Sequence, residues 1–309
     1  MLIVRLIQYN INSNMSENNN KKHVSFSQFS TYLSCPKQFY WDKVMGLKEF
    51  SDNINTCFGS SIHLVFQLYI KTLYTESLEK AEEIDCKTLF QEAFLNELTT
   101  KNIKYTEEDY NSYLTDGYNI ILAFLHTPNR IKYFPAGKYE FIDVELKIDL
   151  PVKNNVDFVA YIDLVLKDKE SGDVKIIDFK TSSLGWNKWQ ISDYKKLAQL
   201  LLYKALYSKK FNVPLNKIDI EFFIIKRKLY EDVSYPQSRI QTLVPQHNNK
   251  IIGEAMKDFI EFLDTCFTPT GNYIIEESTY KQNPGKSRKN CKYCSHAKVR
   301  CNQKQELID

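Results

Sequence analysis

Apolar residues recur along the chain with two different periods. From residue 62 to residue 73 they lie three and four positions apart, which predicts a helix that begins near Gly59. The mixed-charge sequence that follows, from about 75 to 135, keeps the helical spacing and is interpreted as a helical insertion. Residues 23–58, which precede the helix near Gly59, predict short N-terminal helices, since Pro36 suits the first turn of a helix better than its interior. The first half of the chain is therefore expected to be mainly helical.

Near residue 139 the spacing changes to that of strands. Segments 139–150, 156–166 and 174–180 are rich in Val, Ile and Phe and are joined by short turns, which predicts an antiparallel meander of three strands. A helix over about 193–207 and an almost unbroken apolar strand over 218–225 follow. The expected fold class is α/β, with a core of helix, three-strand meander, helix and strand.

Composition and charge narrow the class of protein. The 309 residues are 43% hydrophobic and 14% aromatic, enough for a large core, while the formal net charge is only +3. A nucleic-acid surface must therefore come from local clustering, and residues 281–304 hold eight basic side chains and no acidic one. No segment has the roughly 20 consecutive apolar residues that span a bilayer, so no membrane association is expected. Residues 1–22, rich in Asn, Ser and Lys, predict a flexible leader.

Two aspartates and a lysine stand out within the predicted strands. Asp178 and Lys180 are two residues apart on one strand and share a face, while Phe179 points to the other side. Asp163 lies on the preceding strand, close to the position across from Asp178. Solvated surface charges are the usual explanation, but each aspartate follows apolar strand residues, where a charge is costly unless it is paired or metal-bound. Carboxylates beside a lysine are what metal-assisted phosphodiester hydrolysis requires.

Further motifs accompany these residues in a fixed order. They are Gly59-Ser60-Ser61-Ile62-His63, Ile162-Asp163, Asp178-Phe179-Lys180-Thr181 and Gln199-Leu200-Leu201-Leu202-Tyr203. The series resembles the ordered motifs of the PD-(D/E)xK nucleases, specifically the RecB-like branch, from about Val24 to Cys301. The resemblance implies a restriction-endonuclease-like core over 59–265 and a deoxyribonuclease that hydrolyses phosphodiester bonds. One departure is Ala160-Tyr161, where the family usually has a glycine.

The resemblance also assigns a metal site. Asp163 and Asp178 would bind Mg²⁺ or Mn²⁺, assisted by the Phe179 carbonyl and by His63. Glu145, on the strand before Asp163, is a further candidate ligand. A single histidine on an amphipathic helix is more often structural, so the role of His63 depends on its Gly-x-x-x-His context. A helix that opens at a glycine there would also admit a phosphate to its N-terminus.

By the same resemblance, Lys180 would orient or activate the attacking water. Gln199 and Tyr203 lie four residues apart on one helix face and would support the site or contact DNA. The expected substrate is single-stranded or end-bearing DNA, cut by an exonuclease. The alternative is a nuclease-derived subunit or inhibitor that binds nucleic acid without cutting it.

The chain carries no recognisable ATP-driven motor. Gly285-Lys286-Ser287 is similar to the end of a P-loop, but Tyr280 occupies the position of the earlier glycine that a P-loop needs. Any unwinding would therefore come from a helicase or from a recombination or CRISPR partner protein.

Seven cysteines, an odd number, argue against a disulfide framework and for a reduced, cytoplasmic protein. Cys291, Cys294 and Cys301 offer three thiolates to a soft metal. Residues 26–36, which include Cys35, resemble the N-terminal cysteine motif of iron–sulfur nucleases in the same branch. This resemblance implies a [4Fe–4S] cluster held by the four cysteines.

Two other states of these cysteines are considered. A zinc site is expected to use His296 in place of Cys35, together with Cys291, Cys294 and Cys301, because zinc accepts three thiolates and one imidazole. Free thiols are the third possibility. In each case residues 266–309 are expected to form a basic, cluster-binding segment, whose interleaved Tyr280 and Tyr293 favour contact with a DNA backbone.

Overall fold

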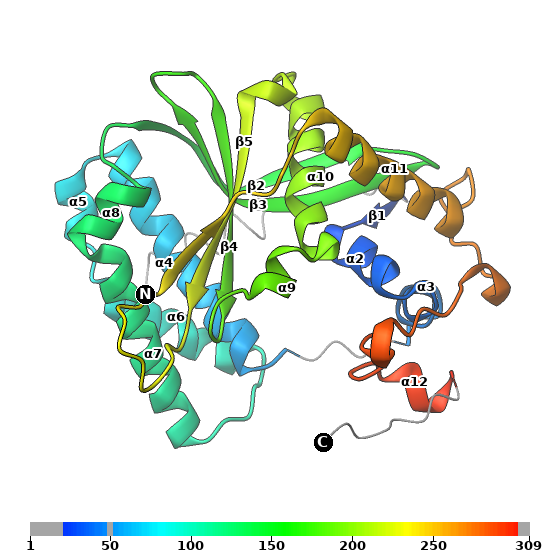
Figure 1. Cartoon of the computed structure of the whole chain (residues 1–309), viewed down its shortest axis with the longest axis horizontal. Helices are drawn as coiled ribbons and strands as arrows, with labels where there is room; N and C mark the ends of the chain where they lie inside the picture. The colour runs from blue at the N-terminus through cyan, green and yellow to red at the C-terminus, as the bar shows by residue number, and fades with distance from the viewer. Residues whose placement is uncertain (1–20, 48–51, 302–309) are drawn as a thin grey trace.

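A computed structural model describes residues 21–47 and 52–301 (Figure 1). Most of the predicted leader therefore lies outside the described residues, although Lys22 already belongs to a strand. No helix within the described ranges is long and apolar enough to cross a membrane.

A mixed sheet of six strands forms the centre of the molecule. Its strands are β1 (Lys22–Val24), β2 (Tyr139–Pro151), β3 (Val156–Asp168), β4 (Val174–Ser182), β5 (Ile218–Lys226) and β6 (Ile240–Leu243). The antiparallel meander predicted from the apolar pattern is confirmed as β2, β3 and β4, and β5 is parallel to β4. β1, parallel to β3, and β6, antiparallel to β5, are strands that the sequence did not predict.

β1 and β4 share one edge of β3, since β2 occupies the other edge along almost its whole length. β1 pairs with residues 156–158 and β4 with residues 164–167. No described strand pairs with residues 159–163 on that edge. The sheet is therefore split there, and the gap opens beside Asp163.

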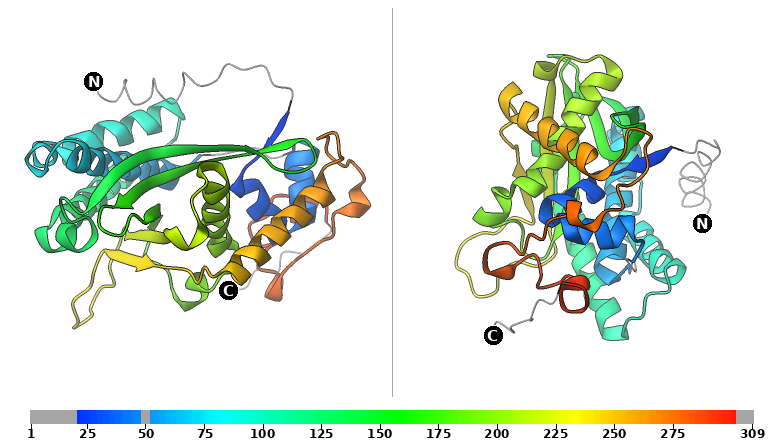
Figure 2. Two further views of the ribbon diagram at one scale, coloured as in Figure 1. Left: turned by 90° about the horizontal axis from the view of Figure 1, so that it is seen from above. Right: turned by 90° about the vertical axis from the view of Figure 1, so that its right-hand side faces the viewer.

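Helices cover both faces of the sheet (Figures 1 and 2). The group that lies on one side is α4 (Ile54–Thr75), α5 (Leu78–Glu82), α6 (Cys86–Thr100), α7 (Glu107–Leu125) and α8 (Thr127–Tyr133). The longer helices on the other side are α2 (Phe26–Ser34), α10 (Tyr194–Phe211) and α11 (Asn249–Cys266). Shorter elements are α3 (Pro36–Phe39) with a π-helical turn (Tyr40–Val44), α9 (Lys188–Ile191), α12 (His296–Val299) and three 3₁₀ turns (Leu215–Lys217, Glu277–Thr279, Lys286–Arg288).

The two helical layers enclose two separate hydrophobic cores. Successive residues of β5 enter different cores: Phe222 packs on the α10 side and Phe223 on the α4 side. Burial of both faces explains why β5 is an almost continuous apolar run. Aromatic rings fill much of the core under α4, where Phe66 and Phe124 stack with their centroids 3.8 Å apart.

α4 begins at Ile54, not near Gly59 as predicted. The Asn53 side chain caps it by accepting hydrogen bonds from the backbone N–H groups of Asn55 and Thr56. Gly59 lies in the second turn, where an added Cβ would be only 3.0 Å from Thr181 Oγ1. The glycine thus permits a close approach of α4 to β4, and the expected phosphate site at a helix start there is wrong.

Candidate active site and cysteine pocket

The alternation of side chains between the two faces of the sheet is interrupted in β2 and in β3. The interruption lies at Glu145 in β2 and at Asp163 in β3. Ile162 packs in the core on the α10 side, whereas Leu164 packs in the core on the α4 side. The β2 residues paired with them make the same switch. Glu145 adopts φ 51°, a left-handed conformation that is strained for a residue with a side chain. Both strands therefore lose their regular alternation at an acidic residue.

Asp163 and Asp178 meet at the end of the β3–β4 ladder. The last paired residues are Leu164 and Ile177, so the two aspartates would form the next pair. Instead, Asp163 Oδ2 accepts a hydrogen bond of 2.7 Å from the backbone N–H of Phe179, whose ring is fully buried in the α4-side core. The hairpin thus brings the two predicted aspartates together at the split in the sheet.

Lys180 and Asp178 form an ion pair on β4. Lys180 Nζ lies 2.7 Å from Asp178 Oδ2, and the aspartate is only 2% exposed. The lysine side chain is about one-third exposed, so its ammonium group lies at the boundary with solvent. Asp178 Oδ2 forms no hydrogen bond of good geometry with any described residue, which leaves this buried oxygen able to bind a cation.

α10 supplies the polar contacts on the other side of Asp178. Gln199 Nε2 donates hydrogen bonds to Asp178 Oδ1, 2.8 Å away, and to the Tyr203 hydroxyl, 3.1 Å away. The two α10 residues are one helical turn apart, as the sequence predicted. Gln199 therefore fixes the carboxylate of Asp178 against the helix.

α4 contributes His63 and a residue that the motifs did not include. His63 Nδ1 lies 3.8 Å from Asp163 Oδ2. One turn later, Gln67 Nε2 donates to Glu145 Oε1 at 2.6 Å and to the Asp163 carbonyl oxygen at 3.1 Å. Gln67 thus joins the two irregular strands. Its one signal in the sequence is a polar residue among the apolar positions of the predicted helix, and its burial is known only from the structure.

The electrostatics of this group favour binding of a cation. Burial raises the pKa of Asp163 well above its usual value, and the charge of Asp178 raises it further. Burial likewise raises the pKa of Asp178 and of Glu145, although Lys180 and Gln67 oppose the respective shifts.

His63 is uncharged at neutral pH. Burial, followed by the positive charge of Lys180, lowers its pKa to about 3. A neutral imidazole is the form that binds metal. Its 3.8 Å approach to Asp163 is therefore a contact between a carboxylate and a neutral ring and not a charged salt bridge.

The spacing of these side chains is wider than that around a bound ion. No three ligand atoms from His63, Glu145, Asp163 and Asp178 lie within 4.8 Å of one another. A divalent cation bound among these groups would draw the carboxylates closer together. The donor set of carboxylate oxygens and a neutral imidazole suits Mg²⁺ or, better, Mn²⁺.

Three residues of the site, Lys180, Gln199 and Tyr203, line an open cleft of about 730 Å³, and the two aspartates lie behind them. The cleft runs between the N-terminal β1–α2 segment, the unpaired stretch of β3 and the α10 residues. Its lining includes Lys180, Gln199, Tyr203, His23 and Tyr161. Tyr161 is 48% exposed and offers an aromatic ring in the cleft that Lys180 also lines.

The four cysteines of the sequence motif line one pocket, with Cys35 beside Cys291, Cys294 and Cys301. Burial raises the pKa of each of the three C-terminal thiols, and the charge of Cys35 raises all three further. Proximity of negative thiolates is costly unless a metal neutralises them. The structure thus brings together side chains that are more than 250 residues apart in the chain.

Hydrogen bonds hold the two chain ends together around this pocket. The backbone N–H of Lys37 donates to the Lys281 carbonyl oxygen, and Asn290 Nδ2 donates to the Ser34 carbonyl oxygen, 2.7 Å away. The N–H of Asn283 points to Cys35 Sγ at 3.3 Å. Figure 1 shows the C-terminal segment, in orange and red, beside α2 and α3.

His296 also lines the cysteine pocket. Its Nε2 lies 2.8 Å from Asp42 Oδ1, and both side chains are buried.

Two tyrosines of the same C-terminal segment differ in their exposure. Tyr293 is exposed, but Tyr280 is buried against Phe39, so the expectation that both tyrosines contact DNA is wrong for Tyr280.

Comparison with known proteins decides the family. The model of the PD-(D/E)XK nuclease superfamily matches residues 23–302, more than half of the chain. The chain belongs to the PD-(D/E)XK nuclease superfamily. Members are generally hydrolytic nucleases that act on nucleic acid, typically with Mg²⁺ or Mn²⁺. The mixed sheet with helices on both faces is consistent with the core of that superfamily, so the expected α/β class is confirmed.

Other comparisons are less informative for this nuclease. No curated protein gives a significant match to the chain. One of the solved structures that match, described as the crystal structure of SSO0001, is 12% identical and superposes with a TM-score of 0.33. That match covers 97% of this chain and 96% of the other. The assignment to the nuclease superfamily rests on the family model.

Proposed function

We propose that the chain is a metal-dependent deoxyribonuclease whose active site is the group around Asp163 and Asp178. One observation carries the proposal. A buried aspartate oxygen without a well-oriented hydrogen bond lies beside a second buried aspartate and a lysine, at a split in the sheet that opens onto a cleft. Buried charges that no protein group fully compensates are costly to folding and mark a functional site.

The side chains available fit a divalent ion. Asp163 and Asp178 would hold Mg²⁺ or Mn²⁺, with the Phe179 carbonyl, neutral His63 and Glu145 as further ligands. When bound, the ion supplies Lewis-acid stabilisation of the phosphate and a water of lowered pKa.

Lys180 acts as a charged hydrogen-bond donor in this proposal. Burial lowers its pKa, but the charges of Asp178 and Asp163 outweigh that effect and the net shift is upward. A permanently protonated ammonium cannot serve as the general base. It orients the attacking water or neutralises charge that develops on the phosphate.

Gln199 and Tyr203 act through Asp178. The Gln199 amide holds one carboxylate oxygen and leaves the other, Oδ2, toward Lys180. We infer that both α10 residues position the aspartate and line the path of the DNA, since both border the cleft.

We further infer that the protein belongs to the RecB-like branch, that its substrate is single-stranded or end-bearing DNA, and that it acts as an exonuclease. Support comes from the position of β1 and α2, which form one wall of the cleft and are tied to the cysteine pocket. A wall held in place in this way favours entry of a DNA strand with a free end over entry of a duplex without ends. Unwinding of longer duplexes would require a helicase or a recombination or CRISPR partner.

For the pocket itself we infer a [4Fe–4S] cluster bound by Cys35, Cys291, Cys294 and Cys301. Four thiolates from both ends of the chain are the usual ligand set of such a cluster. The cluster would close the chain around the nuclease core and would keep α2 against the cleft. A zinc ion held by Cys291, Cys294, His296 and Cys301 is the alternative that the position of His296 supports.

A cleavage assay tests the proposed activity. Full-length protein is incubated with end-labelled linear and circular DNA, single- and double-stranded, in Mg²⁺, Mn²⁺ or EDTA. We expect metal-dependent shortening of linear single strands and of duplex ends, with circles resistant. Retained DNA binding without cleavage in either metal would support the alternative, a nuclease-derived binding protein. Equal cutting of circles and linear DNA would refute the exonuclease assignment.

A further inference from the structure

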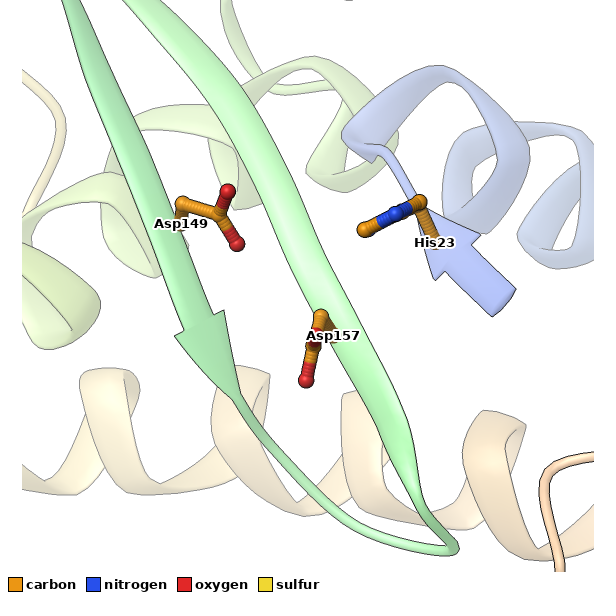
Figure 3. Close-up of side chains that lie close together, drawn as sticks. All are labelled: His23, Asp149 and Asp157. Atoms are coloured by element: carbon orange, nitrogen blue, oxygen red, sulfur yellow. The ribbon is translucent and has the colours of Figure 1, made fainter. Parts of the chain in front are cut away.

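A second group of metal-binding side chains lies on the sheet near β1 (Figure 3). His23, Asp149 and Asp157 each place one ligand atom within 4.8 Å of the others. They are the one set of three His, Cys, Asp or Glu side chains in the described ranges that meets this limit. Asp157 lies six residues before Asp163 on β3, which corresponds to roughly 20 Å along the strand. The group is therefore separate from the proposed catalytic ion.

Strand register places the three side chains on one face. His23 of β1 is directly opposite Asp157 of β3, and Asp149 of β2 pairs with Val159, two residues further along β3. Figure 3 shows the three side chains projecting from three neighbouring strands. The intervening Phe158 points away into the core. Ligands that come from adjacent paired strands are held in place by the backbone ladder before any ion binds.

The donor set has the chemistry of a transition-metal site. Two carboxylates and one imidazole suit Mn²⁺ or Zn²⁺ better than Mg²⁺, because the nitrogen ligand favours the softer ions. No described residue forms a hydrogen bond with the His23 ring, which is exposed. Two lysines compete for the carboxylates: Lys147 Nζ lies 2.7 Å from Asp149 Oδ2, and Lys21 Nζ lies 3.4 Å from Asp157 Oδ1.

We propose that His23, Asp149 and Asp157 bind a divalent transition-metal ion that fastens β1 to the sheet. β1 pairs with β3 over only three residues, yet it leads directly into α2, which forms a wall of the cleft. An ion shared by β1, β2 and β3 would stabilise this short strand, because metal bound only by the folded state adds its binding free energy to folding. The inference does not depend on cleavage of DNA.

Titration with Mn²⁺, followed by the electron paramagnetic resonance signal of the free ion, tests this site. Mn²⁺ has little affinity for thiolates, so the cysteine pocket does not interfere. The parent protein carries Asp178→Asn to remove the proposed catalytic ion, and we expect it to bind one Mn²⁺. His23→Ala in this background should weaken binding at least tenfold, and Asp157→Asn should do the same. His126→Ala, which removes an exposed histidine elsewhere, should leave the affinity unchanged.

A variant that should bind Mn²⁺ more tightly than the parent provides a second test. Lys147→Met removes the ammonium that the ion must displace from Asp149, so Mn²⁺ should bind several-fold more tightly. The proposal is overturned if the parent binds no Mn²⁺ or if His23→Ala and Asp157→Asn bind it as tightly as the parent does. Wild-type protein that cuts no DNA, together with loss of Mn²⁺ binding on His23→Ala in the Asp178→Asn parent, would contradict the proposed nuclease activity and support this site.

Discussion

The cleft and the cysteine pocket both join residues that are distant in sequence, but they are built differently. In the cleft, the acidic and polar side chains project from three strands and two long helices, and direct hydrogen bonds hold them. In the pocket, Cys35 sits between α2 and the four-residue α3, and the other three cysteines follow one another through turns and the four-residue α12. The comparison indicates that the cleft is preorganised by the fold, whereas the pocket, held by turns and short helices, would be fixed by the metal cluster that we propose for its cysteines.

Cys35→Ser tests the dependence of the pocket most strongly. It removes the N-terminal member of the proposed ligand set, so we expect loss of the brown colour of anaerobically purified protein and loss of most bound iron. The two chain ends would then be joined only by hydrogen bonds and packing, and we expect the melting temperature to fall by about 10 °C or more, given the several kcal/mol that a structural metal contributes. Iron analysis, visible absorption and thermal melting measure the effect.

Cys57→Ala is the matched control. Cys57 is fully buried in α4 and is not among the residues that line the pocket, so its replacement should leave colour and iron content unchanged. Brown Cys35→Ser protein with full iron content would contradict the ligand assignment. Colourless wild-type protein with one zinc per chain would show that the zinc alternative is correct.

Gln199→Leu tests preorganisation in the cleft. The change removes both hydrogen bonds of the amide and releases Asp178 from α10. We expect kcat for DNA cleavage to fall about tenfold, since a misplaced metal ligand weakens positioning without abolishing the ion. Tyr203→Phe leaves the Gln199–Asp178 bond intact and should have a smaller effect. An equal loss in the two variants would show that Tyr203 contacts the substrate itself.

Asp163→Asn tests whether the charge of the buried Asp163 carboxylate destabilises the folded protein. The folded-state pKa of Asp163 is raised, so this group favours folding at low pH and that contribution is lost as the pH rises through the folded pKa. In EDTA at pH 7 to 8 the variant should therefore be more stable than the wild type by about 1 kcal/mol, or roughly 2 °C in melting temperature. The asparagine can still accept the Phe179 N–H bond.

The advantage should shrink as the pH falls through the raised folded-state pKa and should vanish below about pH 4, where the aspartate is protonated in both the folded and unfolded protein. Thermal melting across this pH range measures it. A variant less stable than the wild type at every pH would mean that Asp163 makes a favourable structural contact. The proposed difference between the cleft and the cysteine pocket would then be contradicted.

Regular alternation made the central part of the cleft predictable. The two-residue period put Asp178 and Lys180 on one face with Phe179 on the other, and the short hairpin placed Asp163 beside them. The change of face at Glu145 was not predictable, because it depends on a left-handed backbone conformation in a residue that rarely adopts one.

Tertiary packing determined what the sequence pattern could not show. Gln67 became part of the site only when α4 crossed the sheet, and Gly59 proved to be a point of close contact with Thr181. Tyr280 lies within a basic stretch yet is buried, because the C-terminal segment folds back against Phe39. The meeting of Cys35 with the C-terminal cysteines came from the family resemblance alone, since no local period relates residues so far apart.

The most direct test of the nuclease assignment compares two aspartates of the same strand region. Asp178→Asn removes a proposed metal ligand, while Asp173→Asn removes a half-buried partner of Lys217 directly before the strand. Mn²⁺-dependent cleavage of linear single-stranded DNA should fall on the order of 10³-fold or more in Asp178→Asn and stay near the wild-type rate in Asp173→Asn. Cleavage by well-folded Asp178→Asn protein at the wild-type rate would contradict the account.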